Sequence, residues 1–74
     1  MEVYDWNEFI GGDVNETDVV SIMPDVVIKA TEKAVLMAVG EDEIWVPKSQ
    51  IIEADEDSNT IWVTKWIAGK KGWI

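Results

Sequence analysis

Residues 34–47, AVLMAVGEDEIWVP, predict a β-hairpin and with it the class of the fold. Residues 34–39 are apolar on both faces, which is typical of a central strand or of a strand covered by another layer. Residues 40–42 supply the turn, and the chain returns with Ile44 and Val46 on one face and Trp45 on the other. Pro47 has no amide hydrogen to donate, so this strand ends or reaches a sheet edge there.

Short strands are expected on both sides of this hairpin. Residues 19–22 form one candidate that ends before Pro24, and residues 26–31 alternate, with Ile28 on one face and Lys29 on the other. Residues 51–54 and 60–64 flank the loop 55–59, whose Asp, Ser and Asn residues favour turns. The expected fold is therefore mainly β, either a small five- to six-stranded antiparallel sheet or a barrel of SH3-like or OB-like size.

The C-terminus is expected to form a short helical turn over residues 65–71. Gly72 suits the left-handed position that follows a helix, and Trp73 would then pack back onto that helix. Lys70 and Lys71 in the last turn suit the negative end of the helix dipole.

At 74 residues the chain is one domain, and the N-terminal segment differs in pattern from the rest. Residues 1–17 mix aromatic and acidic residues, fit neither a helical nor a strand period, and contain the chain-breaking pair Gly11 and Gly12. Two interpretations stay open: an acidic arm beside a β domain of residues 18–74, or a first strand added to the sheet. Under the first, the β domain folds without the arm.

Acidic residues outnumber basic ones by fifteen to six, and arginine, histidine and cysteine are absent. Residues 1–25 hold seven acids and no base, whereas residues 65–74 hold three lysines and no acid. The net charge of −9 would repel nucleic acids and anionic lipids, so neither is an expected partner. No apolar run reaches the ~18 residues of a membrane span, and a cytoplasmic location is expected.

An enzyme is not expected, because the chain has neither histidine nor cysteine and is small for an enclosed cleft. Residues 55–60 begin like a calcium loop, but Thr60 occupies the position that requires glycine and Trp66 the position of the bidentate glutamate. A hairpin loop explains these acids better. No cofactor and no metal are expected.

Three segments carry a resemblance to a known group of proteins: residues 29–36 (KATEKAVL), residues 45–51 (WVPKSQI), and residues 66–72, WIAGKKG. Over residues 26–74 the chain resembles small uncharacterised acidic proteins of bacteriophages and mobile elements. The resemblance implies a phage accessory role. By analogy with small acidic phage proteins, such a role includes inhibition of host defence in the manner of anti-CRISPR proteins and DNA mimics.

The leading hypothesis is a non-enzymatic inhibitor whose carboxylates occupy the basic groove of a host nucleic-acid-handling protein, such as a nuclease or helicase complex. The alternative is an adaptor or assembly module that binds a protein partner, or itself as a homo-oligomer, through a surface centred on Trp45. Trp45 and Trp62 could form one aromatic patch, and core and interface roles both stay open for Trp45. The candidate partner-binding residues are Asp5, Glu8, Asp13, Glu16, Asp18, Glu41, Asp42, Glu43, Trp45, Lys48, Gln50, Asp55, Glu56 and Asp57.

Overall fold

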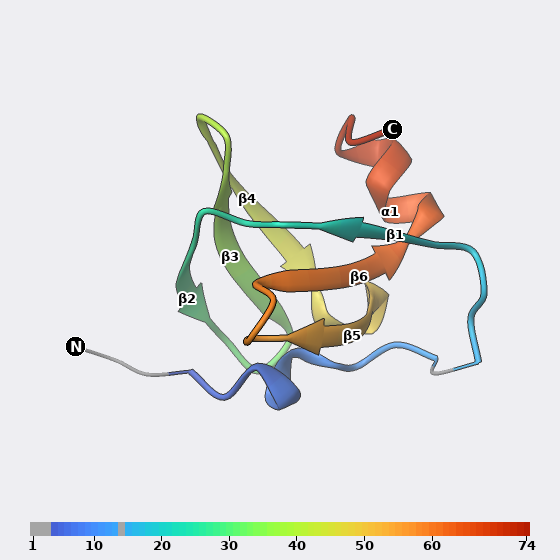
Figure 1. Ribbon diagram of the computed structural model, residues 1–74, viewed down its shortest axis with the longest axis horizontal. Coiled ribbons are helices and arrows are strands. Elements are labelled where there is room, and N and C mark those ends of the chain that lie inside the picture. Colours follow the sequence, from blue (N-terminus) through green and yellow to red (C-terminus); the bar gives the residue numbers. More distant parts are fainter. Residues whose placement is uncertain (1–3, 14) are drawn as a thin grey trace.

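The computed structural model describes residues 4–13 and 15–74, which form six strands, two short 3₁₀ helices and one α-helix (Figure 1). In chain order the elements are η1 (Trp6–Phe9), β1 (Val19–Ile22), β2 (Val26–Ala30), β3 (Ala34–Val39), β4 (Asp42–Pro47), η2 (Lys48–Gln50), β5 (Ile51–Asp55), β6 (Thr60–Thr64) and α1 (Lys65–Lys70). The predicted mainly β class with a short C-terminal helix is confirmed.

The strands form two three-stranded antiparallel sheets, one in the order β1-β6-β5 and the other in the order β2-β3-β4. Of the two alternatives for residues 34–39, a central strand is confirmed, because β3 lies between β2 and β4. The expectation of one sheet or a closed barrel is wrong: β1 pairs with β6 instead of β2, and the described strands do not close into a barrel. Pro24, which has no amide hydrogen, is buried in the connection between β1 and β2.

One hydrophobic core takes side chains from both sheets, from η1 and from α1. Val35 and Met37 of β3 are fully buried, as are Ile61 and Val63 of β6. Because strand side chains alternate in direction, each sheet turns one apolar face to this core and the other face outward. None of the described polar or charged residues is buried, so the core between the two sheets is apolar.

The strict alternation of side chains predicted for β2 is wrong, because a β-bulge interrupts the strand. The register shifts between Val27 and Lys29, which leaves Ile28 as the extra residue. Val27 and Ala30 both pack against the core, whereas strict alternation would have placed them on opposite faces. Ile28 and Lys29 are both exposed.

The N-terminal segment lies against the sheets through η1, which contacts β5 (Figure 1). Phe9 is 1% exposed and belongs to the core, and the described part of this segment contains no strand. The backbone N–H groups of Gly11 and Gly12 both donate to the carbonyl oxygen of Ile51, at 3.2 and 2.9 Å. Residues 1–3 and 14 of the predicted arm lie outside the described residues.

The C-terminal helix ends as its sequence predicts. Gly72 has φ 76°, and its N–H donates to the carbonyl oxygen of Gly69 at 3.3 Å. The N–H of Trp73 donates to the carbonyl oxygen of Ala68 at 2.9 Å, which completes a Schellman motif. The half-buried Trp73 packs against the core, so the predicted return of Trp73 is confirmed.

Candidate functional site

The β5–β6 hairpin loop is held by its own side chains. One carboxylate oxygen of Asp55 accepts from the N–H of Asp57 at 3.1 Å, and the other accepts from the hydroxyl of Ser58 at 2.9 Å. Asn59 has φ 52°, and its side-chain amide donates to the carbonyl oxygen of Pro24 at 2.7 Å. Asp55 and Asn59 therefore shape the loop, and Glu56 and Asp57 extend from it as exposed carboxylates.

Helix η1 adds a fourth carboxylate and an indole beside this loop. The carboxylate of Asp5 accepts from the N–H of Asn7 at 3.0 Å and so caps the 3₁₀ helix. Trp6 is half-buried, and its ring centroid lies 5.9 Å from that of Phe9 in the core. The burial of Phe9 thus fixes where Asp5 and Trp6 lie relative to β5.

The loop and η1 together line an open groove of about 240 Å³. Its lining residues are Asp5, Trp6, Asn7, Ala54, Asp55, Glu56 and Asp57, and we call this site the acidic groove. Four carboxylates and no lysine line it, so its electrostatic potential is negative. Its position explains why the sequence alone did not reveal it: Asp5 and Asp55 are brought together only by tertiary packing.

Trp6, like Asn7 and Ala54, lines this groove but was not among the candidate residues. Its signal was weak, because an aromatic residue among acids in the N-terminal segment fits an arm, a strand or a groove equally well. An indole face beside carboxylates is a favourable environment for an arginine or lysine side chain, through charge pairing and cation–π contact together. The acidic groove can therefore bind a basic side chain of a partner.

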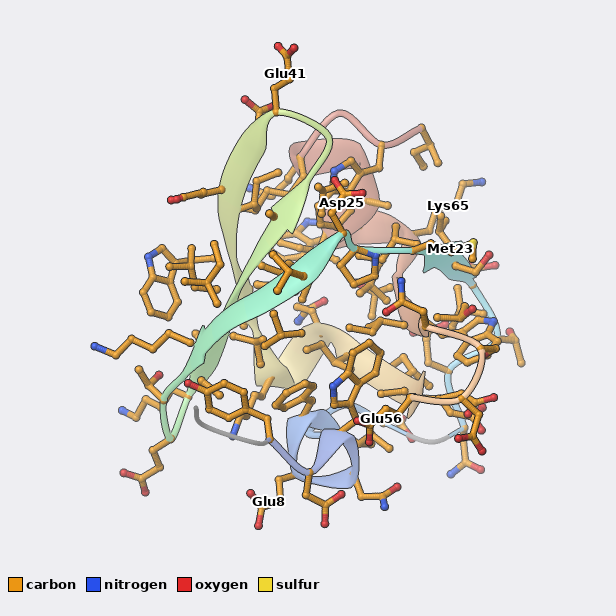
Figure 2. All side chains as sticks on the ribbon, turned by 60° about the vertical axis from the view of Figure 1, so that its left-hand side comes forward. Glu8, Met23, Asp25, Glu41, Glu56 and Lys65 are labelled. Carbon is orange, nitrogen blue, oxygen red and sulfur yellow. The ribbon has the colours of Figure 1, made fainter. Side chains whose placement is uncertain are left out.

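The other predicted acids do not line the acidic groove. Figure 2 shows Glu41 at the tip of the β3–β4 hairpin, at the opposite end of the molecule from Glu8 on η1, and Glu56 lies toward the η1 end. The carboxylates of Asp13 and Glu16, in the segment before β1, accept from the nearby N–H groups of Asn15 and Asp18 at 2.9 Å each. The acids thus divide between the two ends of the molecule and the segment before β1.

Asp18, Asp42 and Glu43 are exposed, and each has a defined place in the fold. Asp18 accepts, through its backbone carbonyl oxygen, from the N–H of Lys65 at 2.8 Å, which joins the start of β1 to the start of α1. Asp42 and Glu43 begin β4 next to the turn that carries Glu41. They belong to the hairpin end and not to the acidic groove.

The candidate residues Trp45, Lys48 and Gln50, near the β4–β5 corner, have different surroundings. Trp45 is 44% exposed on β4, whereas Trp62 lies on β6 of the other sheet, so the two tryptophans do not share a sheet face. The side-chain oxygen of Gln50 accepts from the hydroxyl of Thr64 at 2.6 Å, which gives Gln50 a structural contact at the start of α1. Lys48 lines a separate hollow of about 590 Å³ together with Glu8.

The ionisable groups of the described chain all lie at its surface. Of the fifteen acids, Glu2 is outside the described residues and the remaining carboxylates are all exposed. Among the described residues, no group of three or more Asp or Glu side chains has an arrangement that could hold a metal ion. These exposed carboxylates can pair with cationic groups.

No family model, curated protein or solved structure matches this chain. None of the helices in residues 4–13 and 15–74 is long and apolar enough to cross a membrane.

Proposed function

We propose that this protein is a non-enzymatic inhibitor that binds a basic groove of a host nucleic-acid-handling protein through its acidic groove. The observation that carries the proposal is the convergence of Asp5, Asp55, Glu56 and Asp57 around Trp6, with no lysine among the lining residues. A phage-type role, a host-cell cytoplasmic location and a nuclease or helicase complex as the target are parts of the same proposal.

The clustered negative charge of the acidic groove supports a likeness to nucleic acid. B-DNA presents one negative charge per ~1.7 Å of axis, and proteins that handle it bind those charges with lysine and arginine. The acidic groove offers several carboxylates on a loop and a helix start that are held by hydrogen bonds, so less loop entropy is lost on binding. Because the hairpin acids around Glu41 lie at the other end of the molecule, the proposed mimicry is confined to the acidic groove.

A second candidate function is an adaptor that binds a protein through a surface centred on Trp45. The exposure of Trp45, at 44%, favours it, because tryptophan is enriched where interfaces bury their main contacts. The two candidates differ in their response to salt. Binding through the acidic groove should weaken steeply as salt rises, whereas an apolar interface should change little.

The test begins with affinity capture of the partner from host lysate, followed by binding measurements with the purified partner. We expect Glu56→Lys with Asp57→Lys to weaken binding by about 100-fold, because like charges then meet across the interface. Asp55 is left unchanged because its carboxylate holds the loop. The matched control, Glu41→Lys with Asp42→Lys, makes the same charge change at the hairpin end and should bind as the wild type does.

DNA should compete with the protein for the partner's groove. Equal weakening by both double variants would show that only net charge matters, and the acidic groove would not be the site. Normal binding by the Glu56→Lys, Asp57→Lys variant, or capture of a phage structural protein in place of a nucleic-acid-handling protein, would overturn the proposal.

A further inference from the structure

The outward face of the β2-β3-β4 sheet follows from its register. Val35 pairs with Val46, and both are fully buried, so this pair points into the core. Because alternate pairs point to opposite sides, the neighbouring pair of Leu36 with Trp45 points outward. The face comprises Val26, Lys29, Leu36, Ala38, Glu43 and Trp45, and we call it the outer sheet face.

The outer sheet face is largely apolar and open to solvent. Trp45 is 44% exposed, Val26 is 54% exposed, and Ile28 in the β2 bulge beside them is 41% exposed. Contiguous apolar area of this kind marks interaction surfaces more often than single exposed side chains do. The face is also locally neutral, with Lys29 and Glu43 as its two charges, on a chain whose net charge is −9.

The two charges have a self-complementary arrangement. Lys29 lies on edge strand β2 in the same cross-strand row as Leu36 and Trp45, whereas Glu43 lies on edge strand β4 in the next outward row. A two-fold axis parallel to the strands, between two facing sheets, would place β2 of one copy over β4 of the other. Lys29 would then face Trp45 of the second copy, with Glu43 of that copy about 7 Å further along the strand.

We propose that the outer sheet face binds a second copy of this chain across such a two-fold axis. In this arrangement each Lys29 has both a cation–π partner and a carboxylate partner, and each contact occurs twice by symmetry. Leu36 and Ala38 meet their own symmetry copies at the centre. The acidic ends lie outside the contact, and at about 0.15 M salt a Debye length of ~8 Å screens much of their repulsion.

The size of the face sets the expected strength of the dimer. Three strands spaced about 4.8 Å apart, with five or six residues each at ~3.3 Å per residue, cover a footprint of roughly 14 by 17 Å. This footprint corresponds to a total buried area below about 1,200 Å², the range of weak and transient complexes. We therefore expect monomer and dimer in exchange, with a Kd on the order of 10–1,000 μM.

Sedimentation equilibrium over a concentration series up to about 1 mM tests the proposal with the full chain. We expect Trp45→Ala to raise the dimer Kd at least about 30-fold, since a buried tryptophan is lost twice per dimer. Trp66→Ala is the matched control, because Trp66 is 59% exposed on α1, outside the outer sheet face, and should leave the Kd unchanged. Circular dichroism of each variant establishes that it remains folded.

A charge exchange tests the two-fold arrangement itself. Lys29→Glu and Glu43→Lys should each raise the Kd about tenfold, because each places like charges together twice per dimer. The double exchange restores opposite charges and should return the Kd to within about threefold of the wild type. A chain that remains monomeric at 1 mM, a dimer insensitive to Trp45→Ala, or a double exchange no better than the single variants would each overturn the proposal.

Discussion

Substitution of Phe9 by alanine measures whether the N-terminal segment is part of the folded domain. Phe9 is 1% exposed, and its ring centroid lies 5.9 Å from that of Trp6 and 6.3 Å from that of Tyr4. A buried aromatic side chain removes ~150–250 Å² from water, which at ~25 cal/mol/Å² corresponds to about 4–6 kcal/mol as an upper bound. Measured Phe→Ala substitutions in protein cores cost about 3–5 kcal/mol.

The expected loss is large against the stability of so small a domain. At ~0.05–0.15 kcal/mol per residue, a chain of this length has a free energy of unfolding of roughly 4–11 kcal/mol. Phe9→Ala should therefore remove about a quarter or more of that free energy, and Phe9→Leu, which keeps part of the volume, about 1–2 kcal/mol. Urea titration monitored by tryptophan fluorescence and circular dichroism measures both losses.

Asn7→Ala is the control on the same 3₁₀ helix. Because Asn7 is exposed, this substitution should change the free energy of unfolding by less than about 0.5 kcal/mol. A Phe9→Ala variant within 1 kcal/mol of the wild type would refute the reasoning. Residues 1–17 would then be the detachable arm that the sequence suggested, and the domain boundary at residue 18 would stand. With the large loss, deletion of residues 1–17 should also lower the thermal transition markedly.

Four further substitutions test backbone positions. Gly12→Ala should lower the free energy of unfolding by about 1–3 kcal/mol, because the new Cβ would lie 2.9 Å from two backbone carbonyl oxygens. Gly69→Ala should raise the free energy of unfolding by about 0.5–1 kcal/mol, because the space around its Cβ in α1 is open. Thermal melts of the two variants compare these effects. Gly72→Ala should cost about 1–2 kcal/mol, because Gly72 has φ 76°, and a cost near zero would contradict the Schellman ending. Asn59→Ala should cost about 1–2 kcal/mol, because the hydrogen bond to Pro24 is lost and the backbone at residue 59 has a positive φ. Chemical denaturation measures this loss, and we expect the m-value to stay unchanged.

Local patterns in the sequence determined most of the secondary structure. The apolar run at residues 34–39, the Gly40 turn and Pro47 defined one hairpin, and the polar loop 55–59 between two β-branched runs defined another. These signals depend on neighbouring residues, through side-chain alternation and turn preferences, so they can be recognised without the rest of the chain. The helix end at Gly72 was predictable for the same reason.

Only the tertiary structure decided how these elements combine and where the candidate sites lie. The pairing of β1 with β6, and the burial of Phe9 that brings Asp5 to Asp55, join residues about forty or more positions apart. Burial in a shared core selects such contacts, and no local period in the sequence encodes them. The bulge beside Ile28 is a similar case, because the shift that turns Val27 inward depends on packing between the sheets.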